Sequence, residues 1–352
     1  MKTKVICLDP RFPDLKALGD AAKVLRRGGL VVFPTETVYG LAADFANAEA
    51  MRRLRELKDR PEGKPFSILI AQRGLITNYT SMSDPVLYKV LWEFCPGPLT
   101  LVVPARDGET TIGVRVPDNL IAAKLVQEAQ LTVAAPSANA AGMPPPRTCQ
   151  EALANFDGRV ELALDGGPCR LGRSSTVVDM TVRPPKVLRE GAITQADIDQ
   201  CVTRKTVVFI CTGNSCRSVM AEYLLKSMVG DKPVDVYSAG TSVFLQSRAS
   251  AETLEVLREE GIDAGGHVSR PINSILLKKA DLIFVMTRQH LRQVLERVPE
   301  VEKRVYLLKE FVDRSSCQDG MDVPDPMGQS RQAYKDCLRL IKEAMHKIVD
   351  LI

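Results

Sequence analysis

A cysteine and an arginine in the spacing Cys-x5-Arg follow an apolar run near the middle of the chain. Residues 207–218 read VVFICTGNSCRS, and the helical stretch VMAEYLLKSMV follows. Backbone N–H groups of such a loop can surround an oxyanion, and the start of a helix adds positive potential that favours a thiolate. The planar guanidinium of Arg217 suits two phosphate oxygens. The pattern therefore predicts that Cys211 is a nucleophile that attacks phosphorus, rather than a buried structural cysteine.

A second set of residues suited to phosphate lies in the first half of the chain. Lys58, Arg60 and Lys64 place three cations within seven residues, after a helix-like stretch. Ser137 and Asn139 follow an apolar run, where a hydroxyl and an amide could face a ligand. A solvated basic surface is the alternative for the cations, because acidic residues are interspersed with them. These residue types by themselves leave the two interpretations open.

The composition is that of a globular protein large enough for two domains. The chain has 352 residues, of which 45% are hydrophobic and 26% charged, and a net charge of +4. This mild charge permits anionic substrates without indicating broad nucleic-acid binding. The nine cysteines show no CxxC spacing, so neither a zinc site nor a disulfide framework is expected. All three histidines lie after residue 204, which excludes a histidine-based triad or a histidine-ligated metal before it.

Hydropathy and cysteine chemistry indicate a cytoplasmic protein without membrane contact. The first residues, MKTKVICLDPRF, reach a proline before any apolar segment, so no signal peptide is expected. No apolar run approaches the roughly 20 residues of a membrane span. A catalytic thiolate also requires a reducing compartment.

Alternating helical and strand-like segments predict two α/β domains with a polar linker at residues 192–205. In the first half, helical spacing occurs at 14–29, 47–58, 84–94 and 119–129, and the strand-like runs are FSILIA, LTLVVPA, TIGVRV, LTVAAP and STVVDM. In the second half, strands at 207–211, 234–238 and 281–286 alternate with helices at 218–229, 248–260, 288–296 and 329–350. We predict a mixed twisted-sheet α/β domain, followed by a small doubly wound parallel-sheet domain whose first strand ends at the phosphate loop.

The second half resembles the low-molecular-weight protein phosphatases over residues 205–352. The matching motifs are CTGNSCRS, SAGT at 238–241, ADLIFVMT at 280–287 and VPDPMG at 323–328. The resemblance implies a doubly wound, cysteine-dependent phosphatase that acts on a phosphoprotein and needs no cofactor. In that family an Asp-Pro pair supplies the general acid, which falls on Asp325 here. The resemblance also implies that Ser218 hydrogen-bonds the thiolate and that Asn214, helped by His267, holds the loop.

Substrate and redox behaviour stay open within this resemblance. Ser215 lies where tyrosine-type members usually have a bulky aliphatic residue, whereas arginine-phosphatase members have a small hydroxyl residue there. This favours phosphoarginine over phosphotyrosine, although Met327 replaces the aromatic residue usual in both groups. Cys216 either forms a reversible disulfide with Cys211 or is a small buried residue without redox use. Arsenate reductases share the loop but need further cysteines after ADLIFVM, and TRQHLRQVLERVPE has none. A phosphoprotein-binding pseudophosphatase would not need the intact set Cys211, Arg217 and Asp325.

The first half resembles the YrdC family of threonylcarbamoyl-AMP synthases over residues 10–195. The main motifs are FPTETVYGLA at 33–42, KDRPEGKPFSILI at 58–70 and APSANAAG at 135–142. The resemblance implies that L-threonine, bicarbonate and ATP, with Mg²⁺ carried by the ATP, become threonylcarbamoyl-adenylate and pyrophosphate. The family's Lys/Arg/Ser/Asn signature falls on Lys58, Arg60, Ser137 and Asn139. By the same resemblance Thr35 and Arg115 hold threonine, and the nucleotide is lined by Lys64, Thr111, Ser137, Ser175 and Arg189.

Some positions depart from the family pattern. AGMPPPRT replaces the usual SGxPSPT, so Pro145 removes a hydroxyl that normally approaches the nucleotide, and GRSST at 172–176 lacks a frequent glutamate. GPCRLGRS mimics a Walker loop, but no long helix is expected after it. The resemblance implies the tRNA threonylcarbamoyl transferase machinery as a downstream partner, with RNA as a further candidate. The alternative is a double-stranded RNA-binding module fused to a phosphotyrosine phosphatase, which would not need the intact four-residue signature.

Overall fold

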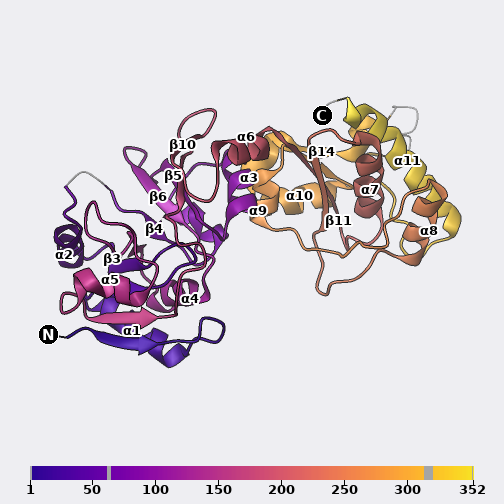
Figure 1. Ribbon diagram of the computed structural model, residues 1–352. Coiled ribbons are helices and arrows are strands. Elements are labelled where there is room, and N and C mark those ends of the chain that lie inside the picture. Colours follow the sequence, from indigo (N-terminus) through magenta and orange to yellow (C-terminus); the bar gives the residue numbers. More distant parts are fainter. Residues whose placement is uncertain (1, 62–64, 313–319, 351) are drawn as a thin grey trace. The chain divides into compact units, whose positions relative to one another are not determined.

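The computed structural model describes residues 2–61, 65–312, 320–350 and 352. The chain divides into two compact units, and Figure 1 colours it from indigo at the N-terminus to yellow at the C-terminus. Unit 1 comprises Met1–Met82 and Val90–Cys201, and unit 2 comprises Ser83–Lys89 and Val202–Ile352. Lys64, which the sequence places near the nucleotide, lies outside the described residues. No helix within the described ranges is long and apolar enough to cross a membrane.

Unit 1 is built on a mixed sheet, to which the described residues contribute ten strands. In spatial order these are β1 (Lys4–Cys7), β8 (Leu162–Asp165), β2 (Val31–Phe33), β3 (Gly40–Asp44), β7 (Val133–Ala134), β4 (Ile68–Leu69), β6 (Thr111–Arg115), β5 (Leu99–Pro104), β9 (Thr176–Asp179) and β10 (Lys186–Arg189). The pairs β1–β8, β2–β8, β4–β6 and β5–β9 are parallel, and the remaining neighbours are antiparallel. This arrangement confirms the mixed α/β fold expected for the first half.

Two pairs of helices bury the two faces of this sheet. α1 (Leu15–Arg26) and α4 (Leu120–Ala129) share a core with Val31 and Phe33 of β2. α2 (Ala48–Lys58) and α5 (Cys149–Phe156) share a second core with Val32. Consecutive residues of β2 thus enter opposite cores, as the alternation of side chains along a strand requires. The described part of unit 1 also contains η1 (Arg73–Asn78), most of α6 (Gln195–Thr203) and part of α3 (Pro85–Phe94).

The end of α2 fixes where the first pair of predicted cations lies. The Asn47 side chain accepts a hydrogen bond from Ala50 N and begins the helix. Asp59 adopts φ 44°, a left-handed conformation that ends the helix after Lys58. Lys58 is therefore the last helical residue, and Arg60 begins the segment that leaves the helix.

Unit 2 is a small doubly wound domain with a purely parallel sheet. Its strand order is β12 (Val234–Gly240), β11 (Lys205–Cys211), β13 (Leu282–Val285) and β14 (Val305–Leu307). Because β12 joins one side of β11 and β13 the other, the carboxyl end of β11 is a topological switch point. Cys211 is the last residue of β11 and lies at that point, as predicted.

Helices cover this sheet and complete the core of unit 2. α7 (Arg217–Val229) and α11 (Arg331–Val349) pack against each other. Met220 of α7 and Tyr334 of α11 share a core with Phe209 of β11. The other described helices of unit 2 are α8 (Ala251–Glu259), α9 (Ser274–Lys279), α10 (Arg288–Arg297), η2 (Pro299–Arg304) and η3 (Leu308–Phe311). The parallel sheet with these helices confirms the fold class expected for the second half.

Several elements lie outside the segments that the sequence predicted. These are β1, β8, β14, α5 and α9, together with α6, which occupies most of the stretch taken for a polar linker. α6 forms because the Thr194 N–H and hydroxyl both donate to the Asp197 carboxylate, and because Ile198 is fully buried. Only one residue of α6 is buried, so its hydrophobic periodicity is too weak to see in the sequence.

Candidate active sites

The phosphate loop of unit 2 brings a thiol, a hydroxyl and backbone N–H groups together. The Cys211 Sγ atom lies 2.9 Å from Ser218 Oγ, at the first turn of α7. The Asn214 N–H donates to the same sulfur over 3.3 Å. Both donors stabilise negative charge on sulfur, as a thiolate nucleophile requires. The predicted pairing of Cys211 with Ser218 is therefore present in the geometry.

Asn214 holds the loop through its backbone and its side chain. It adopts φ 53°, a left-handed conformation that asparagine tolerates better than most residues. Its Nδ2 donates to Ser218 Oγ and Ser238 Oγ, and its Oδ1 accepts from Arg270 N. His267 Nε2 lies 2.9 Å from the Asn214 carbonyl oxygen, and burial lowers the pKa of this histidine. The strained turn is thus fixed from several directions.

The guanidinium of Arg217 faces the loop that carries Asp325. Arg217 Nη2 is 2.5 Å from Asp325 Oδ2, and Nη1 donates to the Val323 carbonyl oxygen over 3.2 Å. The Arg217 side chain is 5% exposed, whereas Asp325 is 48% exposed. The arginine is therefore held in place while the carboxylate stays accessible. A phosphate that bound Arg217 would compete with this carboxylate.

His290 adds a hydrogen-bonding partner that the sequence analysis did not assign. Its Nε2 lies 2.9 Å from Thr212 Oγ1, and its Nδ1 lies 3.0 Å from Thr287 Oγ1. Arg217 Nη2 donates to the same Thr212 oxygen over 3.4 Å. Burial, followed by the charge of Arg217, lowers the pKa of His290 to about 4, so this ring is neutral at pH 7. The sequence around His290 did not indicate this role, because the contact with Thr212 forms only when α10 packs against the phosphate loop.

The residues that the sequence ties to substrate choice and redox behaviour lie in the phosphate loop and in the loop that carries Asp325. Ser215 is half-buried in the loop, and Met327 is exposed. The Cys216 Sγ atom lies 3.4 Å from Ser250 Oγ and 3.7 Å from Tyr334 Oη. Cys211 and Cys216 are both buried free thiols. Their disulfide stays a prediction.

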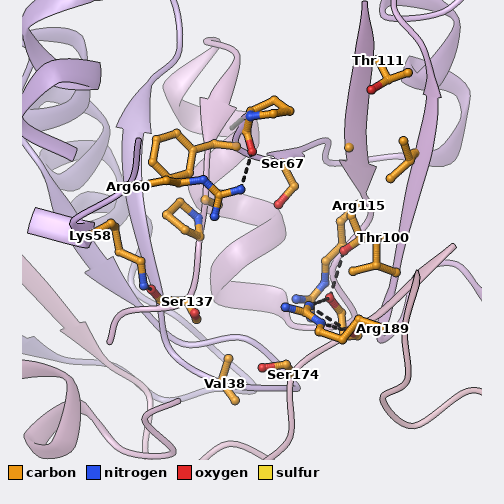
Figure 2. Close-up of a pocket in the computed structure, with 18 residues that line it drawn as sticks. Val38, Lys58, Arg60, Ser67, Thr100, Thr111, Arg115, Ser137, Ser174 and Arg189 are labelled. Carbon is orange, nitrogen blue, oxygen red and sulfur yellow. Dashed lines mark hydrogen bonds between the residues drawn. The ribbon is translucent and has the colours of Figure 1, made fainter. Parts of the chain in front are cut away.

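Unit 1 contains a cavity of about 290 Å³ lined by cations and hydroxyl groups. Its walls come from the end of α2, from β5, β6, β9 and β10, and from the segment after β7 (Figure 2). The predicted residues that line it are Lys58, Arg60, Thr111, Arg115, Ser137, Ser175 and Arg189. Figure 2 shows Lys58 and Ser137 at one side of the cavity and Arg115 and Arg189 at the other. Residues distant in sequence thus form one anion-binding surface.

Two predicted residues that the structure describes, Thr35 and Asn139, do not line the cavity. Thr35 is 4% exposed, and its hydroxyl donates to the Val38 carbonyl oxygen over 2.7 Å. Asn139 lies beside the Lys58 ammonium, with Oδ1 at 3.2 Å from Nζ. Lys64 is outside the described residues. Pro145, where the family usually has a hydroxyl, also does not line the cavity.

Lys58 is held entirely by neutral oxygen atoms. Its ammonium donates to the Ser137 carbonyl oxygen over 2.8 Å, to the Asn139 carbonyl oxygen and to Asn139 Oδ1. Burial, and then the charge of Arg60, lowers the pKa of Lys58 to about 8. The lysine therefore joins the end of α2 to the segment after β7 and keeps its positive charge below that pH.

Arg60 and Arg189 of the cavity are positioned by different interactions. Arg60 lies over the Phe66 ring, with its carbon Cζ 4.8 Å from the ring centroid, and donates to the Pro65 carbonyl oxygen over 2.7 Å. Arg189 Nη2 donates to the Ser175 carbonyl oxygen over 2.9 Å and to Ser175 Oγ over 3.1 Å. Burial, followed by Arg115 and Arg60, lowers the pKa of Arg189. The Ser175 oxygens hold the Arg189 guanidinium without cancelling its charge.

Each half of the chain matches a known protein family. A family model described as "Telomere recombination", of the Sua5/YciO/YrdC type, matches residues 23–191, and one described as "Low molecular weight phosphotyrosine protein phosphatase" matches residues 206–352. A putative threonylcarbamoyl-AMP synthase of Mycobacterium tuberculosis is 31% identical over 53% of this chain and 89% of that protein. The protein-arginine-phosphatase of Bacillus subtilis is 36% identical over 40% of this chain and 93% of that protein. The chain belongs to both families.

The match to a longer relative of the first half covers only part of that relative. The threonylcarbamoyl-AMP synthase of Pyrococcus abyssi is 39% identical over 52% of this chain, and the match covers 56% of that protein. The chain thus spans little more than half the length of this curated relative. The crystal structure of P. abyssi Sua5 complexed with L-threonine superposes with a TM-score of 0.55 and 24% identity, over 87% of this chain and 99% of that one. That likeness shows the fold.

The structure also reveals cavity residues that the sequence analysis missed. Thr100 and Ser174 line the cavity, and Glu36 lies behind it, bonded to Arg115. Within the described ranges, no group of three or more His, Cys, Asp or Glu residues could hold a metal ion. The available signal for Glu36 was that it is the one acidic residue in the largely uncharged run FPTETVYGLA, where an unpaired buried acid would be costly.

Gly240 gives a test of how the phosphate loop is positioned. A Cβ atom on Gly240 would lie 2.4 Å from the Thr212 carbonyl oxygen and 3.0 Å from Asn214 N. We expect Gly240→Ala to displace the loop and lower aryl phosphate hydrolysis by a factor on the order of 100, because displaced N–H donors no longer meet the phosphate. Steady-state kinetics of the purified variant measure this effect.

Gly266→Ala is the matched control, since a Cβ atom there meets no atom within 4 Å. It should retain normal hydrolysis and thermal stability. Normal activity of Gly240→Ala would contradict the proposed fit of the loop against β12.

Proposed function

We propose that the chain is a bifunctional enzyme. Unit 1 would join L-threonine, bicarbonate and ATP into threonylcarbamoyl-AMP and pyrophosphate, and unit 2 would be a cysteine-dependent protein phosphatase. The observation that supports the proposal is that unit 1 has a cavity lined by cations, and that unit 2 has one loop and helix start that supply a thiol and a buried arginine. A relative of the first half is named a threonylcarbamoyl-AMP synthase, and a relative of the second half is named a protein-arginine-phosphatase.

In the synthase reaction, the protein would supply position and positive charge. Threonine's amine adds to CO2 to give a carbamate, whose oxygen attacks the α-phosphorus of ATP and expels pyrophosphate. Lys58, Arg60 and Arg189 would neutralise the phosphates, with Lys64 as a further cation and Mg²⁺ carried by the nucleotide. Such a displacement needs orientation and charge neutralisation more than a histidine base, and residues 1–204 contain no histidine.

The other residues of the cavity have proposed places along the two substrates. Arg115 would bind the threonine carboxylate, with Thr35 supporting it from behind, its hydroxyl 3.5 Å from Nη2. Thr111, Ser137 and Ser175 would line the nucleotide, and Asn139 would hold Lys58. The product is a reactive mixed anhydride, so we propose a tRNA threonylcarbamoyl transferase as its consumer.

In the phosphatase reaction, the Cys211 thiolate would attack phosphorus while Arg217 and the loop N–H groups hold the equatorial oxygens. Asp325 would give its proton to the leaving atom, and Ser218 would stabilise the sulfur. Water would then attack the phosphocysteine, with Asp325 accepting the water's proton and the thiolate leaving as inorganic phosphate forms. The hydrogen bond between Asp325 and Arg217 supports these two roles, because the proposed acid lies next to the proposed phosphate-binding arginine. A reduced thiol fits a cytoplasmic location.

Two substitutions test whether the chain carries two separate activities. Cys211→Ser should abolish aryl phosphate hydrolysis and leave pyrophosphate release near normal, because each site lies within one unit. Arg60→Ala should do the reverse, with pyrophosphate release reduced on the order of 100-fold because a charge on the phosphates is lost. Pyrophosphate release must depend on both threonine and bicarbonate.

Cross-effects in both directions would show that the two sites are coupled. Protein that bound double-stranded RNA but released no pyrophosphate under any condition would instead favour an RNA-binding module. Failure of reduced protein to hydrolyse any aryl phosphate would favour a pseudophosphatase.

The phosphatase substrate is proposed to be phosphoarginine in preference to phosphotyrosine. Ser215 is the residue that supports this choice, because its small side chain leaves the loop edge open and polar. Ser215→Ile should shift the ratio of kcat/KM values toward phosphotyrosine by roughly tenfold, because the larger apolar side chain would pack against the phenyl ring. Kinetics with phosphoarginine and phosphotyrosine peptides of identical sequence measure the ratio.

Ser215→Thr is the control, since it keeps the hydroxyl and should keep the preference. A ratio unchanged by Ser215→Ile would reject Ser215 as the specificity residue.

The pKa of Lys58 gives the synthase site a defined pH dependence. Because the pKa is lowered to about 8, the ammonium is present below that pH and is lost above it. We expect kcat/KM for ATP, which reports the free enzyme, to fall as pH rises through about 8. Lys58→Arg should lower the activity but abolish this fall of kcat/KM at high pH, because a guanidinium stays charged. If kcat/KM of Lys58→Arg fell at high pH as it does in the wild type, a group other than Lys58 would be the one that titrates.

A further inference from the structure

Glu36 forms a buried ion pair with Arg115 at the wall of the cavity. Glu36 follows β2 and is 2% exposed, and its Oε1 lies 2.7 Å from Arg115 Nη2. Thr37 Oγ1 accepts from the same nitrogen over 2.7 Å, and Thr35 Oγ1 lies at 3.5 Å. All of these bonds use Nη2. The described partners of the guanidinium thus all bond to one of its nitrogens.

This ion pair is incompletely satisfied. Arg115 Nε and Glu36 Oε2 are both buried without a hydrogen-bond partner among the described residues. Buried polar atoms without partners are costly, and a buried ion pair is often no more stable than an apolar pair of the same volume. The pair is therefore better explained by what it does in the cavity than by stabilisation of the fold.

The partners of the other cations in the cavity show how the Glu36–Arg115 pair differs from them. Lys58 is bonded to carbonyl and amide oxygens, and Arg189 to the carbonyl and hydroxyl oxygens of Ser175. Neutral partners leave the full positive charge of these groups available. The charge of Arg115, in contrast, is cancelled by Glu36. The cavity therefore has cations with uncancelled charge and one guanidinium that belongs to a neutral pair.

We infer that Glu36 is a specificity-determining residue that decides which anion Arg115 accepts. A polyphosphate is drawn to the uncancelled charges of Lys58 and Arg189. A zwitterionic α-amino acid has no net charge, so the neutral pair can hold its carboxylate without a competing pull from the phosphates. Glu36 thereby separates the amino-acid end of the cavity from the nucleotide end. The threonine part of this inference rests on the proposed synthase function.

The test is calorimetric titration of the full chain with two probes, inorganic pyrophosphate alone and L-threonine alone. In Glu36→Gln, Arg115 gains an uncancelled charge. We expect pyrophosphate to bind roughly five- to tenfold more tightly, as one added charge in a partly buried site implies. L-Threonine alone, which brings one carboxylate and no net charge, should gain less affinity than pyrophosphate, and pyrophosphate should compete with it in the variant more strongly than in the wild type. General damage to the site would weaken both probes.

Thr37→Val is the matched control, because it removes a hydrogen bond to the same Nη2 and keeps the ion pair. It should weaken threonine binding and leave pyrophosphate binding unchanged. If Glu36→Gln does not fold, the double variant Glu36→Leu/Arg115→Met replaces the pair with apolar residues. That variant should bind pyrophosphate like the wild type and lose threonine binding.

Two results would overturn the inference. One is unchanged or weaker pyrophosphate binding in Glu36→Gln, and the other is loss of pyrophosphate binding in the double variant, which would make Arg115 a phosphate ligand. Wild-type protein that bound no threonine would contradict the proposed synthase function. The pyrophosphate measurements would still decide whether Glu36 cancels the charge of Arg115.

Discussion

A cation withdrawn from water must find oxygen partners, and the charge of those partners decides what the cation can still bind. Lys58 is buried and Arg189 is exposed, and both bond to neutral oxygen atoms, so their charge remains available in the cavity of unit 1. Arg115 has a carboxylate partner and belongs to a neutral pair. In unit 2, Arg217 lies between a carbonyl oxygen and the exposed carboxylate of Asp325, which an incoming anion can displace. Both proposed chemistries depend on these local differences.

The elements that provide the partners are those whose geometry is most constrained. The left-handed residue Asp59 ends α2 so that the Lys58 ammonium meets the segment after β7. The left-handed Asn214 turns the phosphate loop so that its N–H meets the sulfur of Cys211. Neither conformation is favourable by itself. In each case surrounding hydrogen bonds or the packed helix end hold the backbone, and the site acquires a fixed position for its charge.

The two units organise their sites differently. In unit 2 one strand-loop-helix segment supplies nucleophile, anion donors and arginine, because the carboxyl end of β11 lies at the switch point of a parallel sheet. In unit 1 the cavity takes residues from α2, β5, β6, β9 and β10, so no single segment contains it. A local site can be read from one motif, whereas a distributed site requires the whole sheet to be assembled.

The sequence alone determined the fold class of both halves, the position of the thiol at a strand end and the main cations of the cavity. Cys211 and Arg217 are identifiable because their spacing places them on either side of a loop after a strand, whereas Lys58 and Arg60 are singled out only by the family resemblance. Only the tertiary structure decided that Glu36 backs Arg115, that His290 reaches Thr212, and that Thr35 lies behind the cavity wall. Those relations join residues about 80 positions apart, as between Glu36 and Arg115. Chain spacing carries no information about which side chains meet across a sheet, because strand order and packing bring those side chains together.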